Sequence, residues 1–143
     1  IERVLRETKW KKVLAAERTF WEKATILHAC FHQREDKPLG PRQSRHYYDV
    51  VKLYEKGIGK AAIQNPDLLA SVAKHKSIFF RSAGAKYEEA TPGSLRLVPP
   101  VARRTERETD YAKMSEMMFG DPPAFGELLD VLAKIEDAVN KGR

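Results

Sequence analysis

Apolar residues recur at helical spacing in successive stretches of this 143-residue chain, and that pattern constrains the fold more than any other feature. Strand patterns are weak throughout, so the sequence predicts an all-α fold. The clearest helix is expected to start at Asp121-Pro122-Pro123, and it has apolar side chains at every third or fourth position: Phe125, Leu128, Leu129, Leu132, Ile135 and Val139.

Four further helices are expected over about 16–32, 44–55, 65–80 and 103–118. Ser44 is a plausible N-cap, and Asn65-Pro66 combines an N-cap with proline at the first helical position. A short helical turn is expected after Gly57-Ile58-Gly59. The side chains predicted to be buried on these four helices are Phe20, Ala24, Leu27, Phe31, Tyr47, Val50, Val51, Tyr54, Leu68, Leu69, Val72, Phe79, Tyr111, Met114 and Met118.

Two regions lie outside this pattern. Residues 82–100 contain three prolines and two glycines, which predicts a long irregular loop with 95–98 extended. Residues 1–15 are a basic lead-in, expected to form either an edge strand or an extended arm. We therefore expect a five-helix, bundle-like domain over 16–143.

Composition narrows the class of protein. Cys30 is the only cysteine, which excludes an internal disulfide and a cysteine-rich zinc site. The longest apolar stretches are a few residues long, too short to span a membrane. Residues 1–12 carry five Lys or Arg and are not followed by an apolar signal region. These features predict a soluble protein of a reducing compartment, the cytoplasm.

Charge is unevenly distributed. Residues 1–86 hold 18 basic and 9 acidic side chains, whereas residues 87–143 hold 8 basic and 11 acidic ones. A basic N-terminal part fits a phosphate-bearing partner, although a need for solubility explains it equally well.

Many catalytic motifs are missing. The sequence contains no P-loop, dinucleotide fingerprint, HExxH or nucleophilic serine elbow. It also has no Asp-x-Asp or Asp-Asp pair to hold Mg²⁺, and His28, His32 and His75 lack metal-ligand spacing. No metal site is expected in this chain.

Lys23 projects onto the apolar side of the first predicted helix. At about 100° per residue it lies between Leu27 and Cys30, whereas Glu22 and Thr25 point away. A lysine stem can follow apolar surface while its ammonium reaches water. An ammonium that cannot reach water needs an anion, and phosphate is a common partner.

Asp49 lies at the edge of the buried stripe of the second predicted helix, one turn after Arg45. An i, i+4 ion pair between them is the ordinary interpretation and contributes about 0.3–0.5 kcal/mol. His46, one turn before Val50, is either a core-edge histidine or a polar member of the same corner.

Several segments together resemble the AbiEii/AbiGii nucleotidyltransferase toxin family. They include RTFWEKATILHA at 18–29 and SRHYYDV at 44–50, followed by 75–83, 92–100 and 118–120. The similarity begins near residue 17 and extends to the C-terminus. The resemblance implies a toxin, often from a bacterial toxin–antitoxin or phage-defence pair, that transfers a nucleotide from an NTP to an acceptor such as tRNA.

The resemblance also implies roles for particular residues. Lys23 and Asp49 match the catalytic lysine and aspartate of the helical C-terminal half, and Lys23, Arg45 and His46 fall at nucleotide- or phosphate-binding positions. The family often has Arg-Asp-x-x-Asp where this chain has Arg45-His46. Mg²⁺ and its carboxylate ligands are implied for an N-terminal half. Because the sequence starts at Ile1 and lacks clustered carboxylates, we expect the C-terminal helical part of such an enzyme, inactive alone.

Two other functions are compatible with the sequence. A basic helical module could bind nucleic acid or a cognate antitoxin without catalysis, with Trp10 or Trp21 stacking on bases. Such aromatic residues are more often part of a core. A plain scaffold domain, in which the Lys23 ammonium simply reaches water, is the third interpretation.

Overall fold

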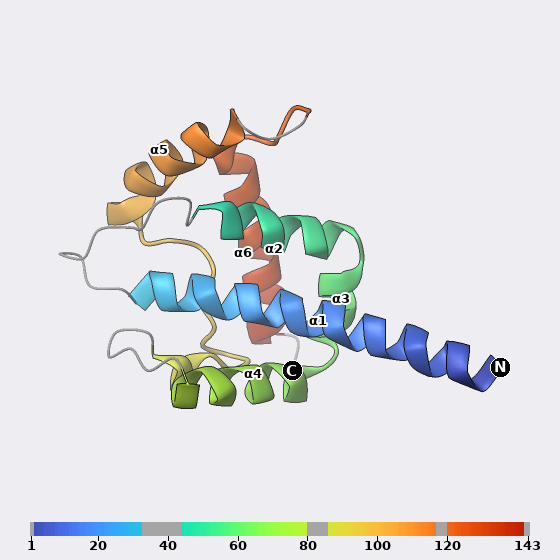
Figure 1. Cartoon of the computed structure of the whole chain (residues 1–143). Coiled ribbons are helices and arrows are strands. Elements are labelled where there is room, and N and C mark those ends of the chain that lie inside the picture. Colours follow the sequence, from blue (N-terminus) through green and yellow to red (C-terminus); the bar gives the residue numbers. More distant parts are fainter. Residues whose placement is uncertain (1, 33–43, 80–85, 117–119, 142–143) are drawn as a thin grey trace.

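The computed structural model describes residues 2–32, 44–79, 86–116 and 120–141, and it confirms the all-α prediction: no strand is present among them. The described residues form six helices instead of five, because the turn expected after Gly57 is a short helix of its own (Figure 1). The elements are α1 (Glu2–His32), α2 (Arg45–Glu55), α3 (Ile58–Ile63), α4 (Pro66–Phe79), the 3₁₀ turns η1 (Tyr87–Glu89) and η2 (Val101–Arg103), α5 (Arg104–Ser115) and α6 (Phe125–Lys141).

Helix α1 is one continuous element of 31 residues. The expectation of an edge strand or extended arm over 1–15 is therefore wrong from Glu2 onward. At 1.5 Å per residue the helix is about 46 Å long, and its N-terminal part projects beyond the other helices (Figure 1). The C-terminal part is the central element of the domain.

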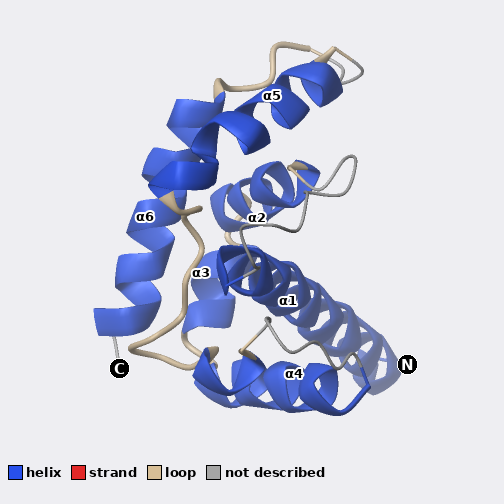
Figure 2. Cartoon of the chain, turned by 90° about the vertical axis from the view of Figure 1, so that its left-hand side faces the viewer, coloured by secondary structure: helices blue, strands red, loops and turns tan. Residues whose placement is uncertain are grey.

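Helices α2, α3 and α4 all pack against α1, with α2 and α4 on different sides of it (Figures 1 and 2). Phe20, Ala24 and Leu27 are fully buried, as predicted. The expectation that Thr25 points outward is wrong, because a helix surrounded on several faces buries more than one stripe. The buried Thr25 hydroxyl lies 2.9 Å from the backbone oxygens of both Trp21 and Glu22 and donates its one hydrogen to this pair.

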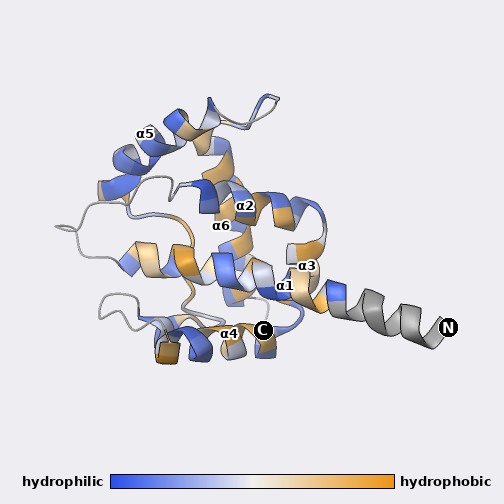
Figure 3. Ribbon diagram, in the orientation of Figure 1, coloured by the Kyte–Doolittle hydropathy of each residue, from blue (hydrophilic) through white to orange (hydrophobic). Residues whose placement is uncertain are grey.

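Helix α6 packs against α2 and α5 and closes the other side of the core. All six of its predicted apolar positions are buried, although the helix begins at Phe125 rather than at Asp121. The Phe125 ring lies 5.6 Å from that of Tyr47 and 5.5 Å from that of Tyr111. Helix α5, by contrast, is largely hydrophilic (Figure 3).

Some details of the helices differ from expectation. Phe79 is 69% exposed, because Lys76 is the buried side chain near the end of α4. Ser44 occupies the N-cap position of α2 but makes no side-chain cap: its hydroxyl donates to Asp110 of α5 instead. Phe31 and Tyr54 are half-buried. The predicted core residue Met118 lies outside the described residues.

The predicted irregular segment is held by side chains of α6. Leu95 and Leu97 are buried, and Asn140 of α6 binds the backbone of Gly93 and Leu95. Glu136 of α6 accepts a 2.7 Å hydrogen bond from the Leu97 N–H. These side chains replace the strand partner that an extended segment would otherwise need.

Candidate functional site

The structure brings the Lys23 and Asp49 side chains together. The Lys23 Nζ on α1 lies 3.0 Å from the Asp49 Oδ2 on α2, and the two side chains are 28% and 19% exposed. The helical spacing of α1 and α2 turns each residue toward the junction of the two helices. Lys23 therefore does not stand in bulk solvent; its ammonium has a carboxylate partner at the edge of the core.

Arg45 and His46 begin α2 and flank the same pair. The Arg45 Nε lies 3.7 Å from the Asp49 Oδ1, so the carboxylate bridges two cations. Burial lowers the pKa of His46 below its usual 6.5, and the nearby Lys23 lowers it further. Its Nδ1 is buried without a hydrogen-bond partner among the described residues. A neutral His46 near pH 7 therefore keeps one polar ring atom unsatisfied.

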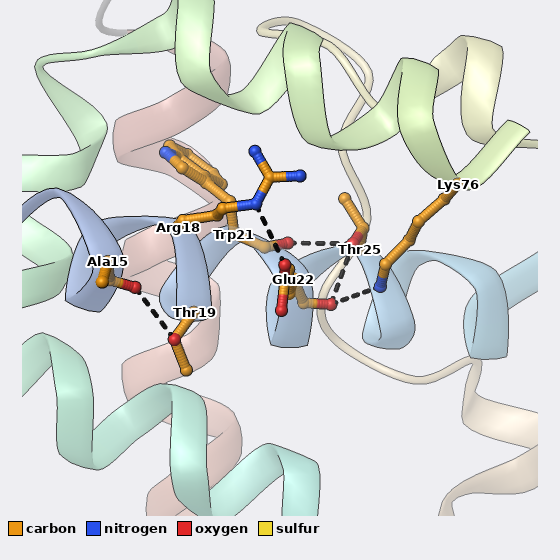
Figure 4. Close-up of polar contacts among 7 residues, drawn as sticks. All are labelled: Ala15, Arg18, Thr19, Trp21, Glu22, Thr25 and Lys76. Carbon is orange, nitrogen blue, oxygen red and sulfur yellow. Dashed lines mark hydrogen bonds and ion pairs between the residues drawn. The ribbon is translucent and has the colours of Figure 1, made fainter. Parts of the chain in front are cut away.

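Lys76, which is not among the candidates predicted from the sequence, lies near the same residues. It lies on α4, is 9% exposed, and donates a 2.5 Å hydrogen bond to the backbone oxygen of Glu22 (Figure 4). Burial lowers its pKa from 10.5 to about 8, and the Lys23 ammonium acts in the same direction. Its position seven residues after Leu69, on the buried stripe of α4, is the pattern by which it could have been found.

Together these groups carry a surplus of positive charge. We call Lys23, Arg45, His46, Asp49 and Lys76 the basic cluster. At neutral pH three of its members are cationic and one is anionic. The adjacent Glu22 carboxylate is paired with the Arg18 Nε at 3.1 Å (Figure 4) and so adds little compensation. Partly buried cations in excess attract an anion, and phosphate oxygens suit Lys and Arg donors.

The basic cluster does not fit a metal ion. Asp49 is its one carboxylate, and both of its oxygens already face cations. Within the described part of the chain no group of three His, Cys, Asp or Glu residues could hold a metal. These residues therefore do not form a binding site for the Mg²⁺ of nucleotide chemistry.

Other sequence candidates have structural roles. His28 is buried, accepting from the Arg96 N–H at Nδ1 and bonding the Lys86 oxygen through Nε2. Trp21 is buried and donates to the Ala62 backbone oxygen, so it cannot stack on bases. For Trp10 the structure describes the helical backbone and not the side chain.

One cavity lies away from the basic cluster. A hollow of about 430 Å³ lies between α1 and α3 and is lined in part by Ala16, Ile58 and Ala61. It contains no member of the basic cluster. No described helix is long and apolar enough to cross a bilayer.

The fold is all-α, and the basic cluster lies at its central helix, α1. The model of one family, described as Nucleotidyl transferase AbiEii toxin, Type IV TA system, matches residues 11–138. The chain therefore belongs to the AbiEii nucleotidyltransferase toxin family of type IV toxin–antitoxin systems. Membership of such a family suggests an antitoxin partner. Neither the curated proteins nor the solved structures contain a match to this chain.

Proposed function

We propose that this chain is the C-terminal helical part of a nucleotidyltransferase that moves a nucleotide from an NTP to an acceptor such as tRNA. An N-terminal catalytic half supplies the carboxylates that bind Mg²⁺. The observation that supports this proposal most directly is the ion pair between Lys23 and Asp49 within a cluster that has excess positive charge.

Nucleotidyl transfer depends on positioning the phosphates and on neutralising the charge that develops on their oxygens. Lys23 is suited to that task, because its ammonium has donors beyond the one used by Asp49. Asp49 orients this ammonium and holds Arg45 beside it. His46 offers a neutral ring rather than the carboxylate often found at this family position.

The residues present indicate which tasks belong to this chain and which belong to the N-terminal half. Two-metal nucleotidyl transfer needs clustered carboxylates, and among the described residues no group of three His, Cys, Asp or Glu side chains could hold a metal ion. The basic cluster therefore binds and orients phosphates, and the metal chemistry belongs to the other half. Phage defence is the biological setting that we propose for the toxin.

The test is transfer of radiolabelled NTPs to total tRNA by the full-length protein with Mg²⁺. Lys23→Ala should abolish labelling, because the phosphates lose their main cation, while circular dichroism and thermal melting stay close to wild type. Lys12→Ala is the matched control, since Lys12 is an exposed residue on the same helix. Retained labelling with Lys23→Ala would remove Lys23 from the site.

A non-catalytic role gives a different result. A basic module that only binds nucleic acid would bind RNA with an affinity that falls steeply as salt rises, without labelling it. A module that only binds an antitoxin would neither label RNA nor bind it. The burial of Trp21 removes one of the stacking residues that favoured the RNA-binding alternative.

A further inference from the structure

Lys76 is a buried cation that forms no ion pair with another described residue. Its side chain leaves α4, crosses to α1 and ends on the Glu22 backbone oxygen (Figure 4). No described carboxylate lies within ion-pair distance of its ammonium, and Glu22, the acidic group that acts on it, is already paired with Arg18. A carbonyl oxygen takes one of the three N–H donors of an ammonium and leaves two.

The neighbours of Lys76 identify what those two donors can bind. The charged or titratable groups that act on the pKa of Lys76 lie on α1 and are Glu22, Lys23 and Cys30. The charge of Lys76 in turn lowers the pKa of His46 on α2. Three of these four groups are cationic or neutral near pH 7. A buried ammonium in such surroundings needs an anion supplied from outside the described residues.

We propose that Lys76 is a further phosphate-binding residue, so that the phosphate chain of the nucleotide lies across α1 between Lys76 of α4 and the Lys23–Arg45 side formed with α2. This inference rests on the proposed function and deepens it. Lys76 is bonded to the residue immediately before Lys23, and α2 and α4 lie on different sides of α1 (Figures 1 and 2). A chain of several phosphates has enough oxygens to bind cations on both sides.

A pH dependence follows for the bound anion. With a pKa of about 8, Lys76 is mostly protonated at pH 7 and mostly neutral at pH 9. An anion binds the protonated form, so its affinity falls as pH rises through 8, approaching about tenfold per pH unit above that value. His46 titrates below 6.5 and burial raises the pKa of Cys30 above 9.0, so neither accounts for a change near pH 8.

The experiment is calorimetric titration of the chain with tripolyphosphate, without metal and at low ionic strength. Lys76→Met should weaken binding by about tenfold or more, because a charge-assisted hydrogen bond is lost. Lys76→Arg should restore affinity and flatten its dependence between pH 7 and pH 9, since arginine stays protonated. Lys74→Met, at an exposed position of α4, should behave as wild type.

The outcomes separate this inference from the proposed function. Wild-type affinity in Lys76→Met, or an unchanged pH profile in Lys76→Arg, overturns the role of Lys76 and leaves the proposed function standing. Unchanged binding in Lys23→Met overturns the proposed function itself. Absence of tripolyphosphate binding by the wild-type chain overturns both. Should Lys76→Met melt early, the pH profile of Lys76→Arg decides the question, because a purely structural lysine would not produce it.

Discussion

Lys23 on α1 and Asp49 on α2 form an ion pair of 3.0 Å between residues 26 positions apart in the chain. The same carboxylate lies 3.7 Å from Arg45, one turn earlier on α2. Asp49 is thus the negative centre of an otherwise basic corner. It limits how strongly the corner attracts free anions while it fixes where the Lys23 ammonium points.

Asp49→Asn should separate these two effects. The basic cluster becomes more positive, so tripolyphosphate should bind about three- to tenfold more tightly at low salt, with a smaller gain at high salt. Nucleotide transfer by the full-length protein should fall, because the Lys23 ammonium is no longer oriented. Calorimetry and the tRNA-labelling assay measure the two quantities. Weaker anion binding in Asp49→Asn would mean that the carboxylate contributes to binding rather than opposing it.

Gly59 of α3 should not tolerate a side chain. A Cβ at this position would lie 2.7 Å from a ring carbon of Phe20 and 2.8 Å from the Tyr54 Cα. Gly59→Ala should therefore destabilise the fold by about 1–3 kcal/mol through overpacking, despite the better helix propensity of alanine. Urea unfolding followed by circular dichroism measures the change.

Gly126 of α6 is the matched control for this substitution. A Cβ there meets nothing within 4 Å, so Gly126→Ala should stabilise the protein by up to about 1 kcal/mol. Equal effects at Gly59 and Gly126 would show that the close approach of α1, α2 and α3 at Gly59 does not govern stability.

The helices of this fold could largely be predicted from periodicity, and the reason is local. Along α6 every predicted apolar position is buried, because one face of that helix meets the core and the other meets water. The start of α4 at Pro66 follows from the restriction that proline places on the chain. Such features depend on residues a few positions apart, which the sequence displays directly.

The features that escaped prediction depend on tertiary surroundings. Helix α1 is packed on several faces, so a single stripe could not reveal that Thr25 is buried. Arg107 of α5 is also fully buried, and its Nη2 donates to the Cys30 oxygen in the last turn of α1. That contact joins residues 77 positions apart, and a charged side chain at that position gives no sign of burial in the sequence.

The candidate site was predictable in part. The inward side of α1 indicated Lys23, and the edge of the α2 stripe indicated Asp49 and Arg45. That the two helices meet at these residues is a property of the packing, which spacing within one helix cannot reveal. The burial of Lys76 could not be predicted, because a lysine on a buried stripe more often lays its aliphatic stem along apolar surface while its ammonium reaches water.

His28 should make the stability of the fold depend on pH. Burial lowers its pKa below 6.5, so the unfolded chain takes up a proton at higher pH than the folded one does. The stabilising contribution is present above pH 6.5 and is lost as pH falls through 6.5 toward the lowered pKa. The free energy of unfolding from urea titrations should therefore be lower at pH 5 than at pH 7.

His28→Gln should reduce that drop while lowering stability at pH 7, because an amide does not titrate and fills the site less well. The slope should not vanish entirely, since burial also lowers the pKa of His32 and His46. An unaltered pH dependence in His28→Gln would assign the effect to those two residues instead.

Asn140 should stabilise the fold by holding the segment that carries Leu95 and Leu97. Its Oδ1 accepts from the N–H groups of Gly93 and Leu95 at 2.9 and 3.1 Å, and its Nδ2 donates to the Leu95 oxygen at 2.9 Å. Asn140→Ala leaves these backbone groups without their partner and should cost about 1–3 kcal/mol, although alanine is the better helix former. Asp130→Ala, at an exposed position of the same helix, should change stability by less than about 0.5 kcal/mol. Thermal melting of the two variants side by side measures the difference, and equal melting temperatures would show that the buried leucines hold the segment without Asn140.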